Sequence, residues 1–186
     1  MFNRLALIGC GLMGGSLALA MQRARLVRHI VAYSPNPQTL QQAQHMGVIH
    51  AATNCPADAV AQADLVVVAV PVAASEKVFL AIADSLSEHA IVTDVGSTKQ
   101  NVIEAAETAF GPRIGQFVPA HPIAGKEVAG IAYADADLYR GKQVILTPTR
   151  STRIGALQQI TALWEALGCK VQTMTPQAHD AAFAAV

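Results

Sequence analysis

A glycine motif near the start of the chain constrains the fold most strongly. In the run IGCGLMGGS, Gly9, Gly11 and Gly14 follow an apolar segment and open a helical pattern. Such a motif combines a glycine for a tight turn, a second where a pyrophosphate approaches the backbone, and a third where a helix packs closely on a strand. We therefore predict a dinucleotide-binding turn, with Leu12 and Met13 also at the cofactor. The alternative is a tight turn that binds nothing.

Apolar strand patterns alternate with helical patterns along the rest of the chain. The strands are apolar throughout, which is typical of a parallel sheet with helices on both faces. The sequence thus predicts an α/β fold with a doubly wound, mostly parallel, Rossmann-like sheet. The predicted strands are 5–8, 29–33, 65–70, 91–93, 116–119, 144–147 and 171–174, and the clearest predicted helices are 36–47, 98–110 and 151–167.

Composition and charge favour a small-molecule partner. The 186 residues are 52% hydrophobic and 14% charged, enough apolar material for a substantial core, and 13 basic residues balance 13 acidic ones without a basic cluster. Neither nucleic acid nor a membrane is therefore the expected partner. Cys10, Cys55 and Cys169 are widely spaced and odd in number, which argues against a disulfide framework and a zinc site and is typical of the cytoplasm.

The end of the chain predicts a second domain. Thr175 and Pro176 have the pattern of a helix start, yet the apolar stretch that follows reaches residue 186 without a capping signal. We expect a dinucleotide-binding domain over residues 1–174. Residues 175–186 are then the first part of a helix that leads into a domain absent from this chain.

The residues after the second predicted strand decide the choice of cofactor. An acidic residue there would bind the ribose hydroxyl of NAD, and a nearby arginine would bind the additional phosphate of NADP. Here Ser34 takes the acidic position, and the closest arginine in sequence, Arg28, precedes the strand. Without a carboxylate to repel a phosphate, we expect NADP or dual use in slight preference to NAD alone.

Further candidates follow the next strands of the predicted sheet, where such sheets bind ligands. Val70 and Pro71 offer an apolar wall, whereas Asp94 and Ser97 lie at a strand-to-helix turn. From the local sequence alone, Ser97 is expected to be the N-cap of the following helix, and Asp94 is expected to close the turn. His121 stands between two prolines in FVPAHPIAG, either as a structural histidine or as a catalytic one held at the cofactor edge.

The ordered motifs IGCGLMGGSLA, DVGSTK, HPIAGKE and TPQAHDAAFAAV resemble those of the prephenate and arogenate dehydrogenases of tyrosine biosynthesis. The resemblance covers almost the whole chain. It implies a nucleotide-binding domain followed by a largely helical domain that forms a homodimer and completes the substrate pocket. It also implies oxidative decarboxylation of prephenate to 4-hydroxyphenylpyruvate, or of arogenate to tyrosine, with NAD or NADP.

The resemblance also implies roles for individual residues. His121 is the general base and Ser97 the active-site serine, which orients the imidazole or binds the substrate hydroxyl. For Glu127 a place at the pocket mouth and a solvated charge stay open, and for His179 we expect a structural or domain-junction role. Two alternatives remain: another Rossmann enzyme, such as a hydroxyacid dehydrogenase or pyrroline-carboxylate reductase, and a nucleotide-binding module without catalysis.

Overall fold

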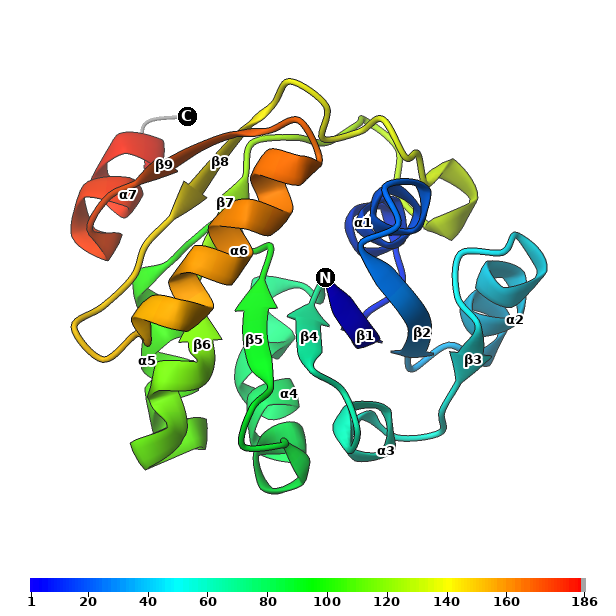
Figure 1. The fold of residues 1–186 in the computed structure, drawn as a ribbon, viewed down its shortest axis with the longest axis horizontal. Helices are drawn as coiled ribbons and strands as arrows, with labels where there is room; N and C mark the ends of the chain where they lie inside the picture. The colour runs from blue at the N-terminus through cyan, green and yellow to red at the C-terminus, as the bar shows by residue number, and fades with distance from the viewer. Residues whose placement is uncertain (185–186) are drawn as a thin grey trace.

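A parallel sheet forms the centre of the computed structural model, which describes residues 1–184 (Figure 1). The sheet has six strands in the order β3-β2-β1-β4-β5-β6, and every neighbouring pair is parallel. This is the order of a doubly wound dinucleotide-binding fold, with its switch point between β1 and β4. The strands are β1 (Phe2–Ile8), β2 (Val27–Tyr33), β3 (Ala51–Ala52), β4 (Leu65–Val68), β5 (Ile91–Asp94) and β6 (Phe117–Val118).

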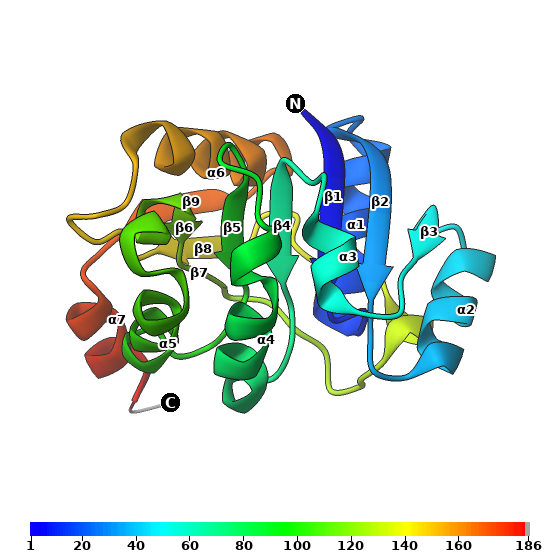
Figure 2. The same ribbon diagram turned by 90° about the horizontal axis from the view of Figure 1, so that it is seen from below.

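Helices cover both faces of this sheet, and Figure 2 shows α3, α4 and α5 on one of them. Alternate residues of β1 enter two different cores: Leu5 and Leu7 pack with α1 and α6, whereas Ala6 and Ile8 pack with α3, α4 and α5. The predicted doubly wound architecture is confirmed. The helices are α1 (Leu12–Arg23), α2 (Pro37–His45), α3 (Pro56–Val60), α4 (Ser75–Ile82), α5 (Gln100–Phe110), α6 (Ile154–Ala166) and α7 (Pro176–Phe183).

A second, three-stranded sheet was not predicted. In it β8 (Gln143–Leu146) pairs antiparallel with β7 (Ala120–Pro122) and parallel with β9 (Lys170–Thr173). The break between the sheets falls at Pro119, which has no N–H to continue a ladder beside β5. Its carbonyl instead accepts a hydrogen bond of 3.1 Å from the amide of Thr147. The prediction of a sixth strand over 116–119 is confirmed by β6, but His121, which was predicted to lie just beyond that strand, itself pairs in the second sheet.

Local signals placed the ends of some elements well and missed others. The Asn36 side chain accepts a hydrogen bond of 3.0 Å from the amide of Gln38, and Gly47 has a φ of +74° just beyond the helix, as the N-cap and terminal glycine predict. Thr175 likewise caps α7. The short elements β3 and α3 were not predicted, since a few residues carry too little periodicity to detect.

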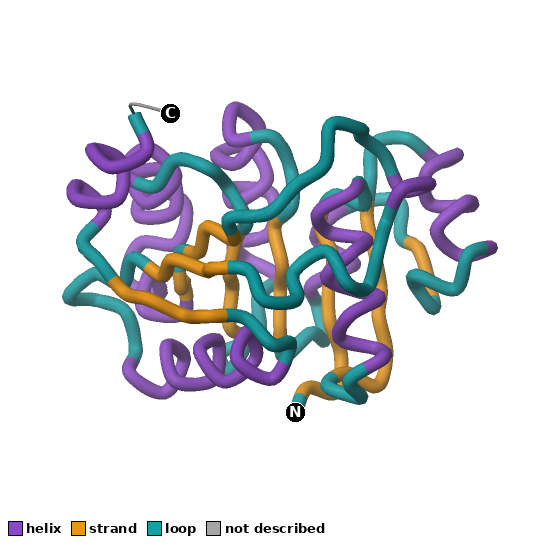
Figure 3. The backbone as a smooth tube through the Cα atoms, turned by 90° about the horizontal axis from the view of Figure 1, so that it is seen from above, coloured by secondary structure: helices purple, strands orange, loops and turns teal. Residues whose placement is uncertain are grey.

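A long connection between β7 and β8 reaches back across the molecule to α1 and α2 (Figures 1 and 3). Four hydrogen bonds attach it to α1. The amide of Asp135 donates to Ser16 Oγ over 2.9 Å, and the Tyr139 hydroxyl donates to the Met13 carbonyl over 2.7 Å. Arg23 donates to the Ala136 carbonyl over 3.0 Å and to Asp137 Oδ1 over 2.7 Å. This connection forms one wall of the cavities described below. Within residues 1–184, each helix is too short or too polar to cross a bilayer.

Candidate functional site

The glycine loop after β1 has a conformation that other residues resist. Gly9 has a φ of +93°, and a Cβ there would lie 2.5 Å from the carbonyl oxygen of Ala69. A Cβ on Gly14 would lie 2.6 Å from the Gly9 carbonyl oxygen, whereas one on Gly11 would meet nothing within 4 Å. The first and third glycines thus serve the turn and the close packing of α1 on the sheet. The second leaves open space at the start of α1.

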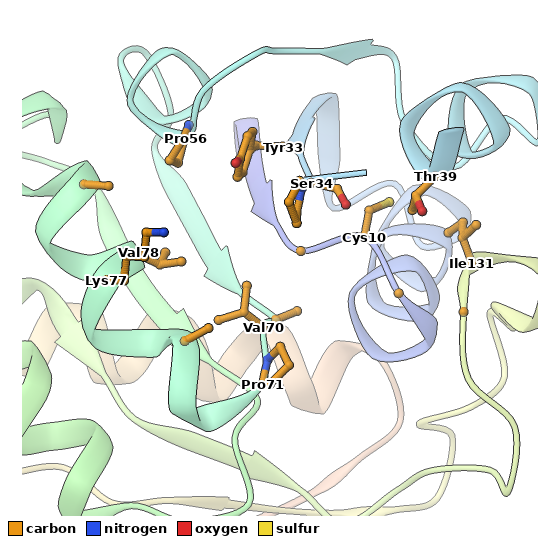
Figure 4. A pocket seen from close by; sticks show the side chains of 17 residues that line it. Cys10, Tyr33, Ser34, Thr39, Pro56, Val70, Pro71, Lys77, Val78 and Ile131 are labelled. Atoms are coloured by element: carbon orange, nitrogen blue, oxygen red, sulfur yellow. The ribbon is translucent and has the colours of Figure 1, made fainter. Parts of the chain in front are cut away.

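A cavity of about 580 Å³ lies against this loop, between the ends of β1, β2 and β4 (Figure 4). Among the residues predicted to bind a cofactor, five line this nucleotide groove: Gly9, Gly11, Ser34, Val70 and Pro71. Leu12 and Met13 line the adjoining cavity described next, and Gly14 packs behind the loop without lining either one. The groove is an open cleft with mostly apolar walls, a form that suits a nucleotide.

Several residues that line the groove were not predicted from the sequence. Lys77 of α4 faces the groove from the side opposite Ser34 and Thr39 (Figure 4). Tyr33 and Pro56 contribute further apolar surface. The sequence carries no local motif for any of these positions, because they reach the groove only through the packing of α2, α3 and α4 around the sheet. Among the described residues that line the groove, Lys77 is the charged one, and no Asp or Glu lines it.

A second cavity of about 500 Å³, the histidine hollow, adjoins the groove. Both His121 and Ser97 line it, so the structure brings together the two residues that sequence analysis named as catalytic. The groove and the hollow share five lining residues: Gly11, Ala69, Val70, Pro71 and Gly130. They therefore form one continuous depression along the carboxyl ends of the strands.

A buried ion pair attaches the strand of His121 to the main sheet. Lys99, which is fully buried, donates to Asp94 Oδ2 over 2.5 Å and to the Ala120 carbonyl over 2.8 Å. The Ala120 amide in turn donates to Asp94 Oδ1 over 3.0 Å. Burial lowers the pKa of Lys99, and the adjacent carboxylate opposes that shift. Asp94 also accepts from the Gly96 amide, so it closes the turn as expected, but its ion pair was not predicted.

The interpretation of Ser97 as a helix cap was wrong. Helix α5 begins at Gln100, and its N-cap residue is Lys99. The first amides of the helix are satisfied by Asp180 of α7, whose carboxylate accepts from Lys99 N over 2.9 Å and from Gln100 N over 3.0 Å. A cap that comes from 81 positions away leaves no local signal. Ser97 is exposed instead, and its side chain is free to face the hollow.

His121 is half-buried beside a second histidine. Its Nδ1 lies 2.8 Å from Nε2 of His179, which is fully buried, and the ring of Phe183 packs on both. Burial, then His179 and Lys99, lower the pKa of His121 to about 4, although Asp180 opposes them. The imidazole is therefore neutral near physiological pH, as a proton acceptor must be.

Ser97, Glu127 and His179 differ in how they relate to His121 and the hollow. Within residues 1–184 the ring of His121 shares its hydrogen bond with His179 and not with Ser97. Glu127 is exposed, and its neighbours Lys126 and Val128 line the hollow while Glu127 does not. Sequence analysis assigned His179 a structural role, and the structure places it in direct contact with the proposed base.

Known proteins match this chain over nearly its full length. The prephenate dehydrogenase nucleotide-binding domain family matches residues 17–173. Prephenate dehydrogenase of Bacillus subtilis is 33% identical over 97% of this chain and 48% of its own length. For cyclohexadienyl dehydrogenase of Zymomonas mobilis the identity is 34%, over 96% of this chain and 60% of the relative. The chain thus spans about half the length of these relatives.

A solved structure is also closely similar. Prephenate dehydrogenase from Aquifex aeolicus, in complex with hydroxyphenyl propionate and NAD+, superposes with a TM-score of 0.91 at 35% identity. The match covers 98% of this chain and 63% of that one. Taken with the doubly wound sheet and the glycine loop, these matches show that the chain belongs to the family of prephenate dehydrogenase nucleotide-binding domains.

Proposed function

We propose that this chain binds a nicotinamide dinucleotide in the groove and supplies the general base for oxidative decarboxylation of prephenate or arogenate. The observation that carries the proposal is the continuity of the groove with the hollow that contains His121. A dinucleotide that lies along the glycine loop would reach from the groove into the hollow. Its reactive end would then adjoin the histidine.

The cofactor's pyrophosphate fits the start of α1. Backbone amides at a helix N-terminus are free to donate, and the helix dipole favours an anion there. Gly11 leaves open space at this point, so its backbone is accessible to a phosphate. The similar protein from Aquifex aeolicus has NAD+ bound, which supports the same class of cofactor here.

For the additional phosphate that NADP carries on its ribose, the groove offers suitable groups. Ser34 and Thr39 provide hydroxyls, and Lys77 provides a positive charge on the opposite wall. Because no carboxylate lines the groove, a phosphate on the ribose meets no repulsion there. We therefore propose that NADP is accepted, either in preference to NAD or equally well.

In the proposed reaction His121 takes the proton of the ring hydroxyl. A bound oxidised nicotinamide supplies the hydride acceptor. As the carbon that bears the hydroxyl loses hydride, the O–H electron pair forms the carbonyl. Loss of carbon dioxide then passes the electrons of the carboxyl C–C bond through the ring to the carbonyl oxygen, which takes the proton back from His121 as the ring becomes aromatic. A general base of this kind contributes roughly 10² to 10⁴ in rate.

Ser97 is proposed to bind the substrate hydroxyl. It is exposed and lines the hollow together with His121, so both can reach one small molecule. The side of the hollow formed by residues 125–130 is exposed. The substrate would enter from this side, or residues outside this chain would cover it there. Activity is accordingly a property proposed for the complete protein, whereas cofactor binding is proposed for this chain.

Calorimetry with NADH and NADPH tests the binding proposal on this chain. We expect saturable binding of at least one of them, and heat from neither would contradict the proposal. In the complete protein, His121→Asn should lower the rate of prephenate or arogenate turnover by roughly 10² to 10⁴. Full activity of that variant would remove His121 as the base, and turnover of neither substrate by the unaltered protein would reject the reaction.

A further inference from the structure

A chain of hydrogen bonds runs from His121 to a carboxylate. His121 Nδ1 lies 2.8 Å from His179 Nε2, and His179 Nδ1 lies 2.7 Å from Asp180 Oδ1. His121 belongs to β7 and the other two to α7, where His179 lies 58 positions further along the sequence. His121 Nδ1 and both ring nitrogens of His179 each have one partner in these bonds, and each partner constrains which nitrogen carries a proton.

Asp180 determines the direction of these bonds because it is held as a carboxylate. It accepts from the amides of Lys99 and Gln100 and, over 3.3 Å, from Gln100 Nε2. Burial alone would raise the pKa of Asp180, but the bonds from Gln100, His179 and Lys99 outweigh it and hold that pKa below its ordinary value. An ionised carboxylate accepts hydrogen bonds and donates none. His179 Nδ1 must therefore carry the proton between them.

The proton on His179 Nδ1 also fixes the direction of the hydrogen bond between His179 and His121. A neutral imidazole has one donor and one acceptor nitrogen, so His179 Nε2 accepts when its Nδ1 donates. His121 Nδ1 must then carry a proton and donate to it, which leaves His121 Nε2 with a free lone pair. Within the described residues 1–184 no protein group bonds to that nitrogen.

We propose that His179 and Asp180 are positioning residues that hold His121 as the Nδ1–H tautomer, with Nε2 as the proton-accepting atom. The inference deepens the proposed function and rests on it for the role of His121. It also gives the HD pair of the TPQAHDAAF motif a purpose beyond connecting domains. Asp180 serves the base and caps α5 with the same carboxylate, so α7, α5 and β7 are locked together at this point.

An aromatic ring packs against both histidines, and few charged groups face His121. His179 is fully buried, and Phe183 packs its ring on both histidines at centroid distances of 5.1 and 4.7 Å. The charged groups that face His121 are Lys99, which precedes α5, and Asp180 of α7, while Asp94 of β5 is paired with Lys99. An imidazolium at His179 would reverse the bond and place the proton of His121 on Nε2. The two arrangements can therefore be told apart.

Long-range ¹H–¹⁵N NMR of the histidine rings in the ¹⁵N-labelled 186-residue chain tests the inference at pH 7.5. Resonances are assigned with His121→Gln and His179→Gln. We expect both rings to be neutral and in the Nδ1–H form, without cofactor or substrate. An Nε2–H tautomer at His121, or a doubly protonated ring at His179, would overturn the inference. Neither outcome depends on turnover, so the base role of His121 is judged separately.

Matched substitutions separate positioning from packing. His179→Gln keeps an acceptor near the position of Nε2, whereas His179→Phe keeps a ring and removes the acceptor. The Nδ1–H form of His121 should persist in the first variant and give way to the Nε2–H form in the second. In the complete protein His179→Phe should lower kcat more than tenfold with little change in KM, and His179→Gln should recover most of that loss. Equal tautomer populations in the two variants would contradict the inference.

Discussion

The nucleotide groove and the histidine hollow adjoin each other but are built in different ways. The turn beside the groove is formed by one short run of sequence. Gly9 and Gly14 in this run lie so close to the loop itself and to Ala69, just after β4, that a Cβ at either position would clash. The hollow depends on contacts between residues far apart, such as His121 with His179 and Lys99 with Asp180, which are 58 and 81 positions apart. A local motif suffices for the first region, whereas the second exists only when the whole domain has packed.

The largest effect is expected from breaking the buried ion pair under the hollow. Lys99→Met leaves Asp94 as an uncompensated buried charge, which costs about 3–5 kcal/mol of unfolding free energy. Lys126→Met is the matched control, because its pair with Asp135 is exposed and should contribute far less to the free energy of unfolding. Urea unfolding measures both variants. Equal losses would show that burial of the pair at Asp94 contributes little.

A smaller loss is expected from a side chain in the glycine loop. Gly9→Ala adds a methyl group 2.5 Å from the Ala69 carbonyl oxygen and strains a φ of +93°. Gly47→Ala strains a φ of +74° but meets nothing within 4 Å, so it should cost only about 1–2 kcal/mol. Thermal unfolding should show the greater loss for Gly9→Ala, together with loss of NADPH binding that Gly47→Ala does not cause. Unchanged binding by Gly9→Ala would argue against the groove as the cofactor site.

The pH dependence of stability probes the hollow when the chain is compared with a variant that lacks His121. Folding depresses the pKa of His121 from 6.5 to about 4, so the unfolded chain binds the proton more readily. Stability should therefore fall as the pH drops from about 6.5 through about 4, by on the order of 2 kcal/mol from this residue. His121→Asn removes the contribution, and the difference between the two unfolding curves isolates it. Parallel curves over that range would mean that His121 is not shielded from protonation.

The smallest effect is expected at the rim of the groove. Lys77 is exposed, and its attraction to a ribose phosphate should contribute below about 1 kcal/mol, or about a fivefold change in affinity. Lys77→Met should weaken NADPH binding by that factor and leave NADH binding unchanged, as measured by calorimetry at low salt. Equal weakening for both cofactors would remove Lys77 as the residue that tells them apart.

Sequence reasoning succeeded where the determining groups are close in the chain. The glycine loop, the cap at Asn36 and the doubly wound pattern depend on neighbours or on regular periodicity, and the structure confirms their geometry. It failed at Ser97, because the cap of α5 is Asp180 from another helix. It also missed the burial of Lys99, since a charged residue is expected to be exposed unless its partner is known.

The strand break at Pro119 lies between these cases. The proline was visible, and its missing N–H explains why the ladder beside β5 ends, but the strand that receives the chain next lies far ahead in sequence. The sequence therefore predicts His121 just beyond the sixth strand, where the structure has it, but it gives no signal that His121 pairs in a second sheet. The contact of His121 with His179 had no signal in the sequence, because β7 and α7 meet only in the folded domain.

Titration of the ¹⁵N-labelled chain with NADH, followed by NMR, tests most directly whether the groove and the hollow form one site. The amides of Gly9 and Gly11 and the ring of His121 should shift together, with a single affinity. Adenosine monophosphate, which lacks the nicotinamide half, should shift resonances of the groove and leave the His121 ring unchanged. If NADH saturates the loop amides while the His121 ring does not respond, the hollow does not receive the reactive end of the cofactor and the account is contradicted.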